Sequence, residues 1–166
     1  EMQAEIFNKR RHGLGITGLG SALNMLGLKY GSNESVELAE KISFTIARAS
    51  LVANIALAKE KGCAPIFKRK ANRELVMNSG YMKRLLGALS EPERKEIVSD
   101  ILEYGLRYSH ATSNAPTGTM SLTWGNNCSN GIEPVFADSY LRNIRSPGKK
   151  TKVQEEVCDY AYFLWK

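Results

Sequence analysis

The sequence predicts an α/β fold that is mainly helical and contains a few strands. Residues 1–105 hold several helical blocks, whereas residues 106–166 read as strand, helix, strand and helix. A helix between two strands is typical of a parallel α/β unit. The chain has 166 residues, of which 43% are hydrophobic, enough for one domain with a sizeable core. Because the early helices have no sheet of their own to cover, we expect a fragment of a larger α/β body.

A glycine-rich segment follows the basic residues near the N-terminus and predicts a helix start packed closely against a neighbour. Gly13, Gly15 and Gly18 match the Gly-x-Gly-x-x-Gly pattern of dinucleotide-binding proteins. That motif must follow a hydrophobic strand, but here Asn-Lys-Arg-Arg-His comes first. Gly13, Gly20 and Gly27 have heptad spacing, which would let another backbone approach. We favour close packing and keep a dinucleotide-binding enzyme as an alternative.

A long helix is predicted from Glu34 to Lys61. Apolar residues recur there at spacings of three and four, which is typical of a buried helix face. Phe44, Leu51 and Ile55 widen this apolar arc, so we expect more than one covered face and assign the helix no chemistry. The periodic residues are Leu38, Ile42, Ile46, Ala49, Ala53 and Ala56.

The segment after this helix is charged and predicts irregular structure over residues 66–87, with a turn at residues 78–80. Residues 90–93 read Ser-Glu-Pro-Glu, which is a capping box with proline in the first turn. The sequence therefore predicts another helix that runs to Tyr104 and ends at Gly105.

The stretch from Leu106 to Ser113 alternates loosely and holds few helix formers, so it predicts an extended strand. Asn114 favours a turn. Pro116 fits the first helical position, where its missing N–H is not needed. A short helix is expected to run to about Trp124 and to stop at Gly125.

The start of this short helix has the chemistry of an anion site. The backbone N–H groups of Thr117, Gly118, Thr119 and Met120 would lack intrahelical partners and would lie at the positive end of the helix dipole. Gly118 lets an anion approach the backbone, and the two threonines add hydroxyl donors. The alternative is an ordinary strand-turn-helix junction, and the residues alone leave both open.

The last part of the chain predicts a loop over residues 131–137 that leads to a strand, and a further strand over Tyr140 to Arg145. Ser146, Pro147 and Gly148 predict a turn. A last helix is expected to begin at Val153 and to continue to Lys166.

The overall composition excludes some classes of function. The chain has a net charge of +6. Its clusters of basic residues are not interleaved with aromatic residues, so we expect no nucleic-acid partner. Cys63, Cys128 and Cys158 are an odd and widely spaced set, which argues against a disulfide framework and a metal site and favours a cytoplasmic location. We expect no membrane partner, because no apolar run reaches transmembrane length. Both ends look cut.

Three motifs resemble, in the same order, segments of the ribonucleotide reductase catalytic chain. Residues 10–20 read Arg-Arg-His-Gly-Leu-Gly-Ile-Thr-Gly-Leu-Gly. Leu-Arg-Tyr-Ser-His at 106–110 leads to Ala-Pro-Thr-Gly-Thr at 115–119, and residues 130–136 read Asn-Gly-Ile-Glu-Pro-Val-Phe. The likeness extends from about Phe7 to the end. It implies a ten-stranded α/β barrel with a radical-bearing loop, of which residues 1–166 would be a single segment of the C-terminal part.

The resemblance also implies the site residues. The family binds substrate phosphates on the Pro-Thr-Gly-Thr stretch, and the Asn-Gly-Ile-Glu-Pro loop lines the neighbouring barrel mouth. Pro-Thr-Gly-Thr is closest to the adenosylcobalamin-dependent class, with the iron-dependent class I large chain as the alternative. The implied substrate-binding residues are Pro116, Thr117, Gly118, Thr119 and Met120, and the further substrate-loop candidates are Asn130, Gly131 and Glu133.

The implied reaction is reduction of ribonucleotides to 2′-deoxyribonucleotides, the precursors of DNA, by a thiyl-radical mechanism. The family's catalytic cysteines lie upstream of this segment, and none of the three cysteines here matches them. We therefore expect no catalytic residue in this chain and no activity from it alone. The full enzyme would bind adenosylcobalamin, deoxynucleoside triphosphate effectors, a thioredoxin-type reductant and the remainder of the catalytic chain. The alternative from another class is a non-catalytic helical scaffold.

Overall fold

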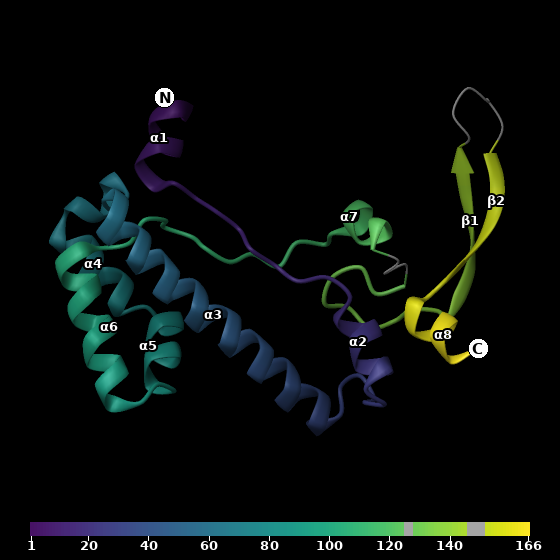
Figure 1. Ribbon diagram of the computed structural model, residues 1–166. Helices are drawn as coiled ribbons and strands as arrows, with labels where there is room; N and C mark the ends of the chain where they lie inside the picture. Colours follow the sequence, from purple (N-terminus) through teal and green to yellow (C-terminus); the bar gives the residue numbers. More distant parts are fainter. Residues whose placement is uncertain (125–127, 146–151) are drawn as a thin grey trace. The chain divides into compact units, whose positions relative to one another are not determined.

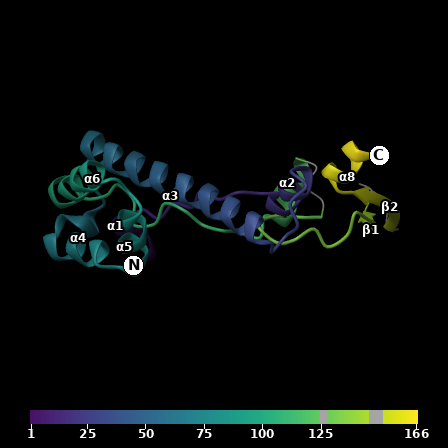
Figure 2. The same cartoon turned by 90° about the horizontal axis from the view of Figure 1, so that it is seen from below.

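The computed structural model describes residues 1–124, 128–145 and 152–166, and Figures 1 and 2 show its elements. The chain divides into two compact units, which we call the first unit (residues 1–14 and 40–113) and the second unit (residues 15–39 and 114–166). The described elements are α1 (Met2–Lys9), α2 (Leu19–Met25), α3 (Asn33–Lys61), a 3₁₀ turn (Pro65–Lys68), α4 (Lys70–Met77), α5 (Gly80–Gly87), α6 (Glu91–Tyr104), α7 (Gly118–Thr123), β1 (Ser139–Arg145), β2 (Lys152–Cys158) and α8 (Tyr160–Trp165).

The core of the first unit lies between the later part of α3, the 3₁₀ turn, α5 and α6. Ile101 of α6 is only 1% exposed and Phe67 of the 3₁₀ turn only 3%. Burial of each such side chain contributes about 1.5–3 kcal/mol to folding. The remaining members of this cluster are Leu51, Ile55, Ala64, Met82, Leu85, Leu86, Leu89, Ile97 and Leu106.

The bounds predicted for α3 are correct to within one residue, but the predicted buried face is wrong in its second half. Ala49, Ala53 and Ala56 are exposed, whereas Leu51 and Ile55 are buried in the cluster. Apolar residues occupy two faces of this helix, and the larger side chains face the core because they bury more area. By length and composition α3 also reaches transmembrane size, contrary to expectation. A single helix of this kind is weak evidence for a membrane span, and Leu51 and Ile55 in its later part pack in the core of the first unit.

Residues 66–87 form regular structure, so the prediction of an irregular segment is wrong. The 3₁₀ turn, α4 and α5 lie there, and Met82 is buried in the core. The predicted break at residues 78–80 does separate α4 from α5. Ser79 caps α5, because its Oγ accepts a hydrogen bond from the backbone N–H of Met82 at 3.2 Å. Packing and this cap stabilise helices that are individually only two turns long.

The predicted helix that ends at Tyr104 is confirmed as α6, and Gly105 follows it with a φ of 74°. The predicted capping box is not formed, because the Ser90 side chain makes no cap hydrogen bond. The carboxylate of Glu93 instead accepts from Nε of Arg48 on α3 at 2.6 Å. An ion pair to a neighbouring helix has replaced the local contact.

No regular strand spans residues 106–113, so this prediction is wrong, although the segment is extended at one point. Thr112 forms an isolated parallel bridge with Leu14. Before that bridge, the side-chain amide of Asn54 takes the place of a neighbouring strand. Its Nδ2 donates to the carbonyl oxygen of Tyr108 at 3.0 Å, and its Oδ1 accepts from the Tyr108 N–H at 2.8 Å. The backbone is thus satisfied without a sheet.

The second unit contains a two-stranded antiparallel sheet, in which β1 pairs with β2 from Ser139 opposite Cys158 to Arg145 opposite Lys152. The strand predicted over 140–145 is confirmed, but the helix predicted from Val153 is wrong. Residues 152–158 form β2, and the last helix begins only at Tyr160. The predicted parallel α/β unit is also wrong, because β1 and β2 are antiparallel. The predicted turn at residues 146–148 lies outside the described residues. The described residues are mainly helical, and they do not form the full ten-stranded barrel.

Candidate functional site

The predicted anion loop lies in the second unit, but its helix starts later than expected. α7 begins at Gly118 rather than at Pro116. Thr117 has a φ of 50°, in the left-handed region, and its carbonyl accepts the first helical hydrogen bond from the Ser121 N–H at 2.8 Å. A left-handed residue cannot lie inside the first turn, so Pro116 stays outside the helix. For a β-branched residue this conformation is strained, and such strain is found mostly at functional sites.

The start of α7 is open on its outer face. A Cβ added to Gly118 would meet nothing within 4 Å. Thr119 is exposed and Met120 is 66% exposed. Within the described ranges, no acceptor is recorded for the backbone N–H groups of residues 118–120. These amides are available to an anionic ligand.

Asn130 joins two of the predicted site segments. Its carbonyl oxygen accepts from the Thr117 hydroxyl at 2.9 Å and from the Gly18 N–H at 3.1 Å. Its side-chain Oδ1 accepts from the hydroxyl of Ser121 at 2.8 Å. The Asn-Gly-Ile-Glu-Pro loop therefore lies beside the Pro-Thr-Gly-Thr stretch. The Thr117 hydroxyl was expected to donate to a ligand, but it already donates its hydrogen bond to the Asn130 carbonyl oxygen.

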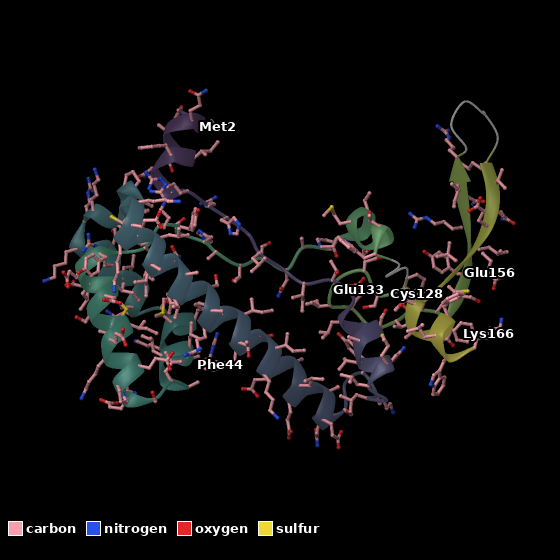
Figure 3. All side chains as sticks on the ribbon, in the orientation of Figure 1. Met2, Phe44, Cys128, Glu133, Glu156 and Lys166 are labelled. Atoms are coloured by element: carbon pink, nitrogen blue, oxygen red, sulfur yellow. The ribbon has the colours of Figure 1, made fainter. Side chains whose placement is uncertain are left out.

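Glu133, labelled in Figure 3, holds this loop in shape. Its carboxylate accepts from the backbone N–H of Asn130 at 2.6 Å and of Gly131 at 2.9 Å. Burial alone would raise the pKa of this carboxyl, but the surrounding backbone N–H donors outweigh it and lower the pKa. A Cβ on Gly131 would lie 3.1 Å from the Ala115 carbonyl oxygen, so glycine permits the close approach of the two loops.

The glycine-rich segment reaches the same loop from its other side. The N–H of Leu19 donates to the Gly131 carbonyl at 3.0 Å, and the N–H of Gly20 donates to Oγ of Ser129 at 2.8 Å. These protein acceptors occupy the N-terminus of α2, where a dinucleotide phosphate would have to bind. The close approach predicted at Gly20 is confirmed, whereas Gly27 meets nothing within 4 Å and forms a left-handed turn with a φ of 67°.

Sequence reasoning missed Ser121 and Ser129, which are both fully buried. Each links segments of this site: Ser121 bonds to Asn130, and Ser129 accepts from Gly20 while donating to the Glu133 carbonyl at 2.7 Å. In the sequence, each of these serines is recognisable only as a small polar residue close to one of the motifs. Serine in such a position is equally common in ordinary turns, so the sequence could not single them out.

Cys128, also labelled in Figure 3, precedes this loop and is fully buried. Burial raises the pKa of its thiol to about 11, and the nearby carboxylates of Asp159 and Asp138 and the thiol of Cys158 act in the same direction. Because the thiolate is the reactive form, we expect Cys128 to react with iodoacetamide at pH 8 at least about 100-fold more slowly than an ordinary thiol. Peptide mass spectrometry against the half-exposed Cys63 measures this rate, and equal labelling would contradict it.

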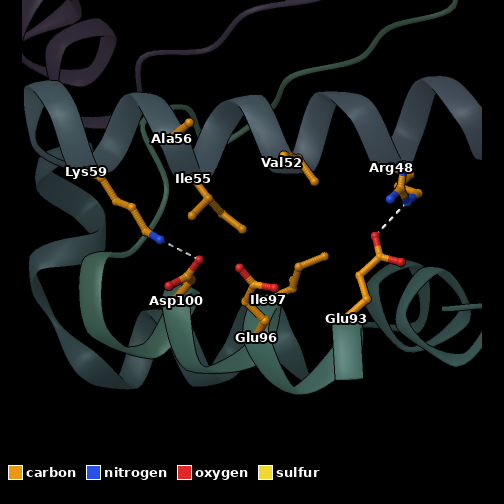
Figure 4. Close-up of a pocket in the computed structure, with 9 residues that line it drawn as sticks. All are labelled: Arg48, Val52, Ile55, Ala56, Lys59, Glu93, Glu96, Ile97 and Asp100. Carbon is orange, nitrogen blue, oxygen red and sulfur yellow. Dashed lines mark hydrogen bonds and ion pairs between the residues drawn. The ribbon is translucent and has the colours of Figure 1, made fainter. Parts of the chain in front are cut away.

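A separate groove lies in the first unit between α3 and α6 (Figure 4). It has a volume of about 520 Å³, and its apolar lining includes Ile55 of α3 and Ile97 of α6. Two ion pairs cross it, from Arg48 to Glu93 at 2.6 Å and from Lys59 to Asp100 at 2.7 Å. Four of its five charged lining residues form these two pairs, and the fifth is Glu96, which carries no chemistry by itself, so we assign the groove none. Within the described residues, no group of His, Cys, Asp and Glu could hold a metal ion.

Known proteins resemble this chain over most of its length. The family model described as “Ribonucleotide reductase, barrel domain” matches residues 1–162. The chain is 35% identical over 135 residues to a vitamin B12-dependent ribonucleoside-diphosphate reductase of Mycobacterium tuberculosis, covering 81% of this chain and 15% of the relative. A Thermoplasma acidophilum protein of the same name is 33% identical over 135 residues, covering 81% and 14%.

A ribonucleoside-diphosphate reductase subunit alpha of Chlamydia trachomatis is 30% identical over 147 residues, covering 82% of this chain and 14% of the relative. The chain thus spans 14–15% of the length of these relatives. The resemblance noted in the three sequence motifs is confirmed. The chain belongs to the ribonucleotide reductase barrel-domain family.

Proposed function

We propose that this chain is part of a ribonucleotide reductase and that its segment Pro116–Met120 binds the phosphates of the ribonucleotide substrate. The observation that carries the proposal is the open start of α7, where the amides of residues 118–120 have no acceptor among the described residues and a Cβ added to Gly118 would meet nothing within 4 Å. Relatives named ribonucleoside-diphosphate reductases support a ribonucleoside diphosphate as the substrate.

In this proposal the chain orients the substrate rather than transforms it. Backbone N–H groups and the Thr119 hydroxyl donate to phosphate oxygens, and the helix dipole favours their charge. Fixing the phosphates places the ribose at one position, so that a cysteine radical elsewhere in the barrel meets its 3′-hydrogen. Asn130, Gly131 and Glu133 shape the neighbouring wall. A cysteine pair outside this chain supplies the electrons.

The adenosylcobalamin-dependent class fits best, because two of the relatives above are named vitamin B12-dependent and the Pro-Thr-Gly-Thr sequence resembles that class. When bound to the complete enzyme, adenosylcobalamin would supply the radical chemistry that oxidises the cysteine. We assign none of the described residues to the cofactor. The subunit-alpha relatives keep the iron-dependent class I enzyme as the alternative.

We further propose that residues 1–166 are one segment of the C-terminal part of the barrel and act with the remainder of that polypeptide in the cytoplasm. The complete enzyme would respond to deoxynucleoside triphosphate effectors, accept electrons from a thioredoxin-type protein and supply deoxyribonucleotides for DNA synthesis. The family match over residues 1–162 supports this assignment.

Kinetics of the complete reductase test the phosphate role. We expect Thr119→Val and Gly118→Val to raise the substrate KM by about tenfold and to lower turnover, because a charge-assisted hydrogen bond is lost or the ligand is kept from the backbone. Thr123→Val, at the exposed far end of the same helix, is the matched control and should leave both constants unchanged. Unchanged KM in both site variants would remove the phosphate role.

A further inference from the structure

We propose that Asn130 is a positioning residue of the reductase: it fixes the anion loop relative to α2 through the hydroxyls of Thr117 and Ser121, which act as clamps and not as ligands. This inference rests on the proposed phosphate role. In this proposal some site residues contact the substrate, and others hold those contacting residues in position.

Asn130 uses its main-chain carbonyl to hold two other segments of the site. Its carbonyl oxygen accepts two hydrogen bonds, one from the Thr117 hydroxyl at 2.9 Å and one from the Gly18 N–H at 3.1 Å. A carbonyl has two lone pairs, so this acceptor is fully used. The Thr117 proton therefore points at protein and not at the open face. The hydroxyl donor left for a phosphate is that of Thr119.

Asn130 is itself held in place by hydrogen bonds of its own loop. Its N–H donates to the Glu133 carboxylate at 2.6 Å. Its neighbour Ser129 is fully buried and bridges the Gly20 N–H and the Glu133 carbonyl, at 2.8 and 2.7 Å. A Cβ on Gly20 would lie 2.6 Å from that same carbonyl oxygen, so α2 and the loop are already in contact. The loop cannot shift without α2.

The two clamps attach on either side of the open amides. Thr117 immediately precedes α7 and Ser121 lies one turn later, so the two bonds to Asn130 bracket the amides of residues 118–120. Thr117 is also held in the left-handed region, with a φ of 50°, which a threonine keeps only under outside constraint. Without either hydrogen bond to Asn130, the backbone amides of residues 118–120 are no longer held in one orientation.

The test uses the complete reductase with Thr117→Val, Thr117→Ser, Ser121→Ala and the double variant Thr117→Val/Ser121→Ala. Valine keeps the shape of threonine without its proton, whereas serine keeps the proton. We expect Thr117→Val to raise the substrate KM by about fivefold, as loss of one neutral hydrogen bond would, with a smaller change in kcat. Thr117→Ser should restore KM. Because both clamps act through Asn130, the double variant should fall short of the product of the single effects.

Amide hydrogen exchange without substrate gives a second readout. Residues 118–120 should exchange faster in Thr117→Val and in Ser121→Ala than in the wild type, while Thr117→Ser should match the wild type. If Thr119→Val raises KM but Thr117→Val does not, the clamp is refuted and the phosphate role stands. Equal rises in KM for Thr117→Val and Thr117→Ser would also refute the clamp, because the hydroxyl would then be irrelevant. If none of the variants, including Thr119→Val, changes KM, the phosphate role fails and this inference fails with it.

Discussion

Replacing Gly20 with alanine is expected to destabilise the second unit by about 3 kcal/mol, the upper end of what an overpacked methyl group costs. The added Cβ would lie 2.6 Å from the Glu133 carbonyl oxygen and 2.7 Å from Oγ of Ser129. Both atoms belong to a tightly bonded loop, so neither can move aside cheaply. Urea unfolding followed by far-ultraviolet circular dichroism measures the change, because this signal reports the secondary structure of both units.

Gly87→Ala is the matched control for this experiment. Gly87 ends α5 in the first unit, and a Cβ there would meet nothing within 4 Å. Alanine favours helix over glycine by up to about 1 kcal/mol, so this variant should be neutral or slightly stabilising. A Gly20→Ala protein that unfolds at the wild-type urea concentration would show that α2 and the loop are not in close contact.

The sequence predicted correctly those elements whose limits are set locally. α3 has an apolar period over many turns, and α6 ends at Gly105, where only a residue that tolerates a φ of 74° fits. Periodicity and end signals of this kind depend on neighbours in the chain. Predictions from such signals therefore do not depend on tertiary contacts.

The errors arose where a distant partner decides the structure. Gln154, Glu155 and Glu156 are good helix formers, yet they form β2 because β1 pairs with them along its whole length. Residues 66–87 looked irregular because each helix there is short, and the core of the first unit stabilises them. In both places tertiary contacts override local preference.

The candidate site shows the same division. The open amides after Thr117 follow from a glycine at a helix start, which the sequence contains. The role of the Thr117 hydroxyl does not follow from its own segment, since its acceptor is the carbonyl of Asn130 in another loop. Sequence motifs placed both segments at the site, but only the structure shows which atoms each segment uses on the other.

Asp159→Ala is the second substitution with a large expected effect, a loss of about 3 kcal/mol in the free energy of unfolding. Asp159 is 1% exposed, and its Oδ2 accepts from the hydroxyl of Ser21 on α2 at 2.6 Å. Its Oδ1 caps α8 by accepting from the Ala161 N–H at 3.0 Å. Alanine leaves a buried hydroxyl without its acceptor, at about 1–3 kcal/mol, and removes a cap that contributes about 1 kcal/mol.

A double-mutant cycle separates the two contributions. Ser21→Ala removes the buried donor, so Asp159→Ala should cost less in that background, with only the cap of α8 left to lose. Asp159→Asn keeps an oxygen for the cap and should be milder than alanine in the wild-type background. Additive effects of Ser21→Ala and Asp159→Ala would show that the two side chains do not share a bond. Because α2 also carries the amides that hold residues 129–131, a loss of the Asp159 contact should in addition speed hydrogen exchange in that loop.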